Sequence, residues 1–170
     1  MVLDIDSLLR VARDSVAVRT TKEVSMKVAD ILGTKGSHVV TGNGDASVLT
    51  AAKLLSDSQV GVLVIVDHDN RVIGTLSERD IVRGLGTVGI RFLDLPVHHI
   101  MSRHFLTCSR NDDVRDVSAT ITHARTRHLP VLDDDGLLAG IVSIGDVLKC
   151  RLDSTELEVR VLRDFYVAHH

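Results

Sequence analysis

The stretch GTLSERD, from Gly74 to Asp80, returns later in the chain as GIVSIGD, from Gly140 to Asp146. Glycine, serine and aspartate hold the same three positions in both copies. A serine followed three residues later by an acid is typical of a capping box, in which the two side chains bond free N–H groups where a helix begins. The same N–H groups and the positive end of the helix also form a phosphate site. The motif therefore has two interpretations, a structural cap and a binding site.

Both motifs belong to a longer internal repeat. The register that places Gly74 on Gly140 runs without a gap back to Thr41, which falls on Thr107, and the hydrophobic pattern agrees throughout. After a shift of three residues, VADIL at 28–32 also matches VHHIM at 97–101. This pattern predicts the following organisation: an N-terminal helical segment at 1–27, a first repeat at 28–86, a linker at 87–96, a second repeat at 97–151 and a C-terminal helix at 152–170.

Each repeat has the pattern of a β-α-β-β-α unit. In the first repeat the expected elements are an extended piece at 38–41, a helix at 46–58 capped by Asp45, a buried strand at 60–67, an antiparallel strand at 71–77, and a helix from Ser77 to about Leu85 that the linker glycines end. In the second they are 105–107, 113–125, 128–133, 137–143 and a helix from Ser143. One such unit has too few strands to cover both of its faces, so we expect an α+β fold in which two units pack sheet to sheet.

The composition argues against several classes of protein. Aromatic residues make up 2% of the chain and the net charge is −3, which disfavours a nucleic-acid partner. No apolar run approaches the roughly 18 residues of a membrane span, so we expect no membrane partner. The acidic N-terminus does not resemble a signal peptide, and the two cysteines form no disulfide framework, so we expect a cytoplasmic protein.

Catalytic and metal-site motifs are also lacking. The residues His98, His99, His104 and Cys108 do not have the spacing of a zinc site, so we expect no metal. The sequence contains no phosphate-binding Gly-Lys loop, no dinucleotide fingerprint and no nucleophile elbow. We therefore expect no catalytic residues and no enzymatic activity.

With these elements the chain resembles a tandem pair of CBS domains, known as a Bateman module, over residues 28–151. The resemblance rests on VLVIVD, a turn and GTLSERD in the first copy, and on HLPVLD, a turn and GIVSIGD in the second. It implies one pseudo-twofold module of the stand-alone two-CBS type. Such modules bind an adenosine-containing ligand (AMP, ADP, ATP, NAD(H) or S-adenosylmethionine) in clefts between the repeats, and they commonly form homodimers. The implied function is a regulatory sensor that signals through its dimer or through a partner enzyme or transporter. The adenine nucleotide is its regulatory ligand, and no cofactor is required.

The resemblance also implies roles for individual residues. The ribose-side candidates are Asp80 and Asp146, because an acceptor-only carboxylate suits the two hydroxyl donors of a diol. The phosphate-side candidates are Ser77, Ser143, Arg79, Arg127, His128 and Lys35. The candidates that contact adenine are Val39, Val40, Thr41, Leu106 and Thr107.

The two copies differ in charge, and simpler interpretations stay open. Arg79 lies inside the first motif only, while Arg127 and His128 precede a strand of the second repeat only. The arginines could be solvated surface side chains, the histidine a half-buried residue at a strand end, and the adenine candidates ordinary core. The motif could then be a pure cap in a ligand-free dimerisation scaffold. The amphipathic segments 3–18 and 154–166 are candidates for the dimer contact.

Overall fold

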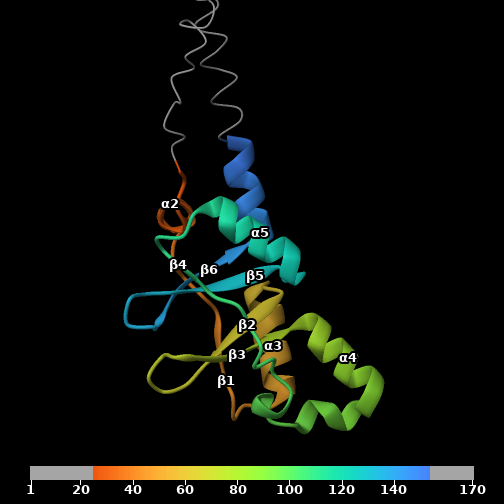
Figure 1. Ribbon diagram of the computed structural model, residues 1–170. Helices are drawn as coiled ribbons and strands as arrows, with labels where there is room; N and C mark the ends of the chain where they lie inside the picture. Colours follow the sequence, from red (N-terminus) through yellow and green to blue (C-terminus); the bar gives the residue numbers. More distant parts are fainter. Residues whose placement is uncertain (1–24, 154–170) are drawn as a thin grey trace, which may run out of the picture.

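The computed structural model describes residues 25–153 as two halves of similar architecture, one above the other in Figure 1. The first half contains β1 (Thr41–Asn43), α3 (Val48–Ser58), β2 (Val62–Val66), β3 (Val72–Ser77) and α4 (Glu78–Val88). The second contains β4 (Cys108–Ser109), α5 (Val114–Ala124), β5 (His128–Leu132), β6 (Leu138–Ser143) and a helix over the described residues 144–153. The helix α2 (Val28–Lys35) comes first in the described chain, and the short 3-10 helices η1 (Ile90–Asp94) and η2 (Val97–His99) join the halves.

Each half is built on a three-stranded sheet with the same topology. The strand orders are β1-β2-β3 and β4-β5-β6, and in both sheets the first pair is parallel and the second antiparallel. Gly74 pairs with Ile65 in one sheet as Gly140 pairs with Val131 in the other. The predicted β-α-β-β-α order and the α+β class are confirmed.

The central strands are buried on both faces, as their continuous apolar sequence predicts. Leu63 and Ile65 of β2 pack in the core beneath the helices of the first half, while Val64, which points to the opposite face, is also fully buried. In β5 the same alternation places Leu129 in the second core and Pro130 on the other face. The buried side chains therefore form two clusters, one for each sheet, and the faces between the sheets are left to line a cleft.

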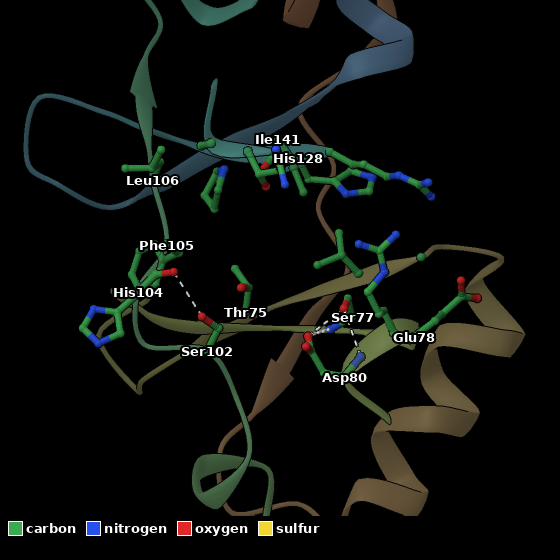
Figure 2. Close-up of a pocket in the computed structure, with 18 of the residues that line it drawn as sticks. Thr75, Ser77, Glu78, Asp80, Ser102, His104, Phe105, Leu106, His128 and Ile141 are labelled. Atoms are coloured by element: carbon green, nitrogen blue, oxygen red, sulfur yellow. Dashed lines mark hydrogen bonds between the residues drawn. The ribbon is translucent and has the colours of Figure 1, made fainter. Parts of the chain in front are cut away.

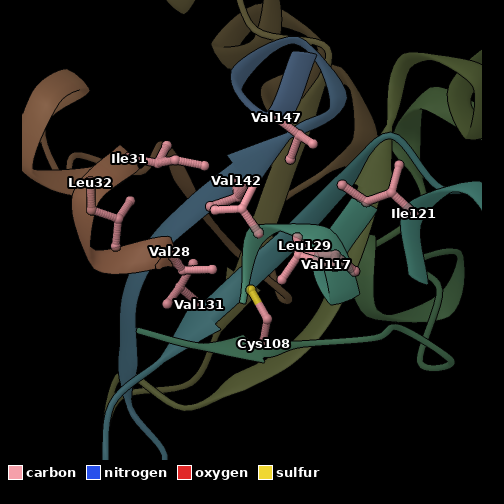
Figure 3. Packing of buried hydrophobic residues seen from close by; sticks show 11 residues of the cluster. Val28, Ile31, Leu32, Cys108, Val117, Ile121, Leu129, Val131, Val142 and Val147 are labelled. Carbon is pink, nitrogen blue, oxygen red and sulfur yellow. The ribbon is translucent and has the colours of Figure 1, made fainter. Parts of the chain in front are cut away.

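The segment that leads each repeat packs on the sheet of the other half. Val28, Ile31 and Leu32 of α2 belong to the core of the second half, where Figure 3 shows them beside Val142 of β6. In the reciprocal arrangement, Val97 and Met101 belong to the core of the first half. The two halves thus exchange their leading segments.

This exchange explains the glycine of the repeated motif. A Cβ atom on Gly140 would lie 2.8 Å from Cδ1 of Leu32, and one on Gly74 would lie 2.6 Å from Sδ of Met101. The exchanged segment approaches the strand so closely that a side chain would overlap it. The repeated spacing of glycine, serine and aspartate therefore combines a packing requirement with a helix start.

The predicted end of α4 was wrong. The helix continues through Gly84 and Gly86 to Val88 and ends at Gly89, whose φ of 80° favours glycine. Gly84 is needed for packing, because a Cβ atom there would lie 1.9 Å from the ring of the buried Phe92. Packing of η1 against α4 outweighs the low helix propensity of the two glycines.

The predicted cap of the helix after β1 was also wrong. Ser47, and not Asp45, caps α3 by accepting a hydrogen bond from the N–H of Thr50. The carboxylate of Asp45 instead lies 3.2 Å from Nδ1 of His98 in the connection between the halves.

The predicted segments 3–18 and 154–166 lie outside the described residues. Within residues 25–153, no helix combines the length and the apolar character that a membrane crossing requires.

Candidate functional site

The first repeated motif forms a complete capping box. Ser77 is the N-cap of α4, and its Oγ accepts a hydrogen bond from the N–H of Asp80 at 3.3 Å. In return, Oδ2 of Asp80 accepts hydrogen bonds from the N–H of Ser77 at 3.0 Å and from its hydroxyl at 2.6 Å. All of these bonds to the carboxylate use Oδ2, and no described residue donates to Oδ1 of Asp80. The cap therefore leaves one carboxylate oxygen with its acceptor capacity unused.

The second motif has the same capping box and one additional partner. Oδ2 of Asp146 accepts from the N–H of Ser143 at 2.7 Å and from its hydroxyl at 2.8 Å. It also lies 2.6 Å from Nζ of Lys35, at the end of the exchanged helix α2. Burial raises the pKa of Asp146, but the hydrogen bonds from Lys35 and Ser143 outweigh that effect and hold the pKa below its usual range. The two motifs therefore differ in the charge that surrounds the aspartate.

A cleft of about 400 Å³ opens between the halves at the first motif. Figure 2 shows Thr75, Ser77 and Asp80 on one wall and His128, Ile141 and Leu106 on the other. Of the predicted site residues, the cleft brings together Ser77, Arg79, Asp80, Leu106, Arg127 and His128. Its size falls in the range of small-molecule sites.

The remaining predicted residues lie elsewhere. Those that do not line this cleft are Lys35, Val39, Val40, Thr41, Thr107, Ser143 and Asp146. Val40 packs against the core of the first half, and Thr41 begins β1, where it pairs with Val64. The chain segment around Leu106 thus faces the motif of the other repeat, and this crossed pairing follows from the exchange of leading segments.

His128 lies both at the start of a strand and on the wall of the cleft. The strand is β5, and the side chain is half-buried. Burial lowers its pKa, and the positive charges of Lys35 and Arg127 lower it further, while Asp146 raises it. The net shift is downward, so the imidazole is largely neutral at pH 7.

Sequence reasoning missed several residues that line the cleft. They are Glu78, Arg83, Ser102, His104 and Arg125. Arg83 follows Arg79 by four residues and so shares its helix face, a signal that could have been found. Arg125 lies in the cleft because it ends α5 in a left-handed conformation with φ of 52°. The sequence contains no signal for that conformation.

The histidines before the second repeat do not converge with Cys108. Nδ1 of His98 lies 3.0 Å from the carbonyl oxygen of Gly44, and its ring packs edge-on against His99. Cys108 is buried in the core of the second half, where burial and the charge of Asp112 raise its pKa to about 12. Among residues 25–153, no three His, Cys, Asp or Glu side chains are grouped as metal ligands.

Comparison with known proteins identifies the two halves. A family model for the CBS domain matches residues 28–87 and 97–153. The structure is similar to that of the CBS-domain containing protein ATU1752 from Agrobacterium tumefaciens, with 38% identity, a TM-score of 0.69, and coverage of 74% of this chain and 98% of that one.

Two similar structures contain adenosine compounds. The CBS domain protein PAE2072 from Pyrobaculum aerophilum, complexed with AMP, has 27% identity, a TM-score of 0.64, and coverage of 71% of this chain and 89% of that one. The CBS domain pair of protein MJ0100, in complex with 5-methylthioadenosine and S-adenosyl-L-methionine, has 26% identity, a TM-score of 0.66, and coverage of 77% and 98%.

Proposed function

Because this chain belongs to the CBS-domain family and carries two copies of the domain, we propose that it is a regulatory module that binds an adenosine-containing ligand in the cleft beside Asp80. The observation that carries the proposal is the unused Oδ1 of Asp80, which lies in a cleft at a helix N-terminus. The adenosine compounds held by two similar structures support the same ligand class.

In this proposal the capping box and the ligand site use the same residues without conflict. Asp80 holds the start of α4 with Oδ2 and accepts the ribose hydroxyls with Oδ1. The first turn of α4, with Ser77 and Arg79, receives the phosphate. Leu106 and Ile141 supply apolar contacts to the adenine ring. By the internal repeat, Ser143, Asp146 and the residues 39–41 would serve a second site in the same way.

Regulation requires that the ligand prefer one arrangement of the two halves. The cleft has walls from both halves, so a ligand that contacts both walls binds a closed arrangement more tightly than an open one. Such a change would reach a partner enzyme or transporter, or a second copy of the chain, through the outer surface of the module.

We include self-association in the proposal because apolar side chains are exposed on the outer helices. Ile144, Leu148 and Leu152 recur at spacings of four residues along one side of the last described helix, and all three are exposed. Val82 of α4 is exposed at the position that corresponds to Leu148 in the internal repeat. A homodimer would cover such a pair of related patches, and the molar mass in solution tests it.

The alternative is a ligand-free interaction scaffold. It is favoured by one observation, namely that both capping boxes are complete without any ligand. In that case the motif would start helices and do nothing more.

Thermal unfolding of the chain with AMP, ATP, NADH and S-adenosylmethionine separates the two functions. A ligand at about 100 times its Kd adds about 2.7 kcal/mol to the stability, which corresponds to a rise in Tm of about 5–10 °C for a chain of this size. The variant Asp80→Asn keeps an oxygen acceptor for the cap and removes the carboxylate, so we expect it to lose most of that rise. Asp134→Asn, in the exposed turn before β6, is the matched control. If no compound raises the Tm of the unaltered chain, the scaffold is supported and the sensor is rejected.

A further inference from the structure

The side chains that line the cleft beside Asp80 carry more positive charge than an adenosine ligand with a single phosphate requires. Four arginines line it, Arg79 and Arg83 from α4, and Arg125 and Arg127 from the segment between α5 and β5. The acidic side chains on its walls are Glu78 and Asp80. Since arginine stays protonated at any physiological pH, the charged lining carries an excess of positive charge at neutral pH.

None of the four arginines has an ion-pair partner among residues 25–153. The described ion pairs, at distances up to 4.0 Å, all lie elsewhere, as the pair between Lys35 and Asp146 illustrates. Arginine side chains that face a shared cleft without carboxylate partners repel one another, and an anion placed between them removes that repulsion. The cleft is therefore complementary to a ligand with several negative charges.

Three of the four arginines are specific to this cleft, while the fourth, Arg83, corresponds to the basic Lys149 in the internal repeat. Gln59 occupies the position that corresponds to Arg125 and has the same left-handed backbone, with φ of 54° and 52° respectively. Gly61 occupies the position that corresponds to Arg127, and Gly145 the position that corresponds to Arg79. The backbone is thus shared by both halves, while the guanidinium groups are concentrated on the side of Asp80.

The arginines come from both walls. Arg79 and Arg83 lie one helical turn apart on α4, and Arg79 is in the first turn, where the helix dipole also attracts anions. Arg125 and Arg127 approach from the opposite half. A phosphate chain that extends from a ribose on Asp80 can contact guanidinium groups of both halves, whereas a single phosphate has fewer oxygens to share among them.

From this charge distribution we infer that the cleft selects an adenosine ligand with two or more phosphates, such as ADP or ATP, over AMP, and that it disfavours the cationic S-adenosylmethionine. The inference rests on the proposed function and adds the ligand class. Each further phosphate adds roughly one negative charge, and placing it among unpaired arginines improves affinity by about tenfold or more.

Calorimetric titration of the full chain with AMP, ADP, ATP, inorganic triphosphate and S-adenosylmethionine, without divalent metal and at two salt concentrations, tests the inference. We expect ATP to bind at least about tenfold more tightly than AMP, with a steeper loss of affinity as salt rises. In the double variant Arg83→Gln/Arg125→Gln we expect ATP affinity to fall about tenfold while AMP affinity changes about twofold or less. Lys53→Gln/Arg91→Gln, which removes two exposed charges outside the cleft lining and away from both repeated motifs, is the matched control.

The possible outcomes distinguish this inference from the proposed function. Equal affinities for AMP and ATP, an equal loss of both in the double variant, or preferred binding of S-adenosylmethionine would overturn the selectivity and leave the adenosine site in place. Inorganic triphosphate that binds as tightly as ATP would show that adenosine is not recognised, and would overturn both. No binding of any adenosine compound would likewise reject both.

Discussion

Removing the charge of Lys35 should destabilise the protein at neutral pH but not in acid. The variant Lys35→Met keeps most of the aliphatic stem of the side chain and loses the ammonium group, which lies 2.6 Å from Oδ2 of Asp146. The side chains of the pair are 30% and 21% exposed, so solvent screens part of the attraction. We therefore expect a loss of about 0.5–1 kcal/mol in the free energy of unfolding at pH 7.

The sign of the pH dependence follows from the pKa of Asp146. Folding lowers that pKa, so the carboxylate stabilises the fold at every pH above the unfolded value of roughly 3.9. Its contribution is lost as the pH falls through the folded pKa, because protonation then removes the charge that Lys35 contacts. The difference between the unaltered chain and Lys35→Met should thus stay constant well above the unfolded pKa and vanish once the pH has fallen below the lowered pKa of folded Asp146.

Urea denaturation of both proteins across this pH range measures the difference. Lys53→Met, on the exposed side of α3, has no ion pair among the described residues and should show no pH-dependent difference. Combining Lys35→Met with Asp146→Asn in a double-mutant cycle isolates the coupling between the two side chains. A destabilisation by Lys35→Met that is the same at every pH would refute the reasoning, since it would assign the effect to packing of the stem.

The close approaches and the buried thiol give two further predictions. Gly74→Ala should lose about 2–3 kcal/mol and Gly140→Ala only about 1–2 kcal/mol, because a Cβ atom at Gly74 also meets the carbonyl oxygen of Ser102 at 3.0 Å, whereas Gly140 meets only side-chain atoms. Urea denaturation ranks the two variants, and the reverse order would contradict the described packing. Cys108, with a pKa of about 12, should resist alkylation at pH 8 in the native protein and react in denaturant. Peptide-resolved mass spectrometry follows the label, and rapid native modification would show that the thiol is accessible.

The order of the elements could be predicted because each rests on local signals. The apolar run at 62–66 is too short for a helix and lies between turn residues, so it indicates a buried strand. The recurrence of Ser77 and Asp80 as Ser143 and Asp146 then predicted a second copy in register, and the two sheets agree with it. The end of α4 could not be predicted in this way, because it depends on Phe92 packing over Gly84.

The site residues that lie next to the motif in the sequence could be predicted. Those that are far from it in the sequence, and reach the cleft only through folding, could not. Arg79 and Asp80 come two and three residues after Ser77 in the chain, and all three line the cleft. Arg125 lines it only because α5 ends in a left-handed residue beside the first motif, which is a long-range consequence of how the halves pack. The contact of Lys35 with Asp146 likewise depends on the exchange of α2, for which the sequence contains no local signal.

That exchange bears on how a protein of this kind could arise. Leu32 fits over Gly140 as Met101 fits over Gly74, so each unit supplies the cover that the other one lacks. Two separate copies of an ancestral single unit could satisfy these contacts reciprocally, as a domain-swapped pair does. Gene duplication and fusion would then have needed only a short connection, such as the one at 89–96, to join two chains that were already interlocked. A single fused chain can also carry different residues in its two copies, as Arg79, Arg125 and Arg127 do opposite Gly145, Gln59 and Gly61.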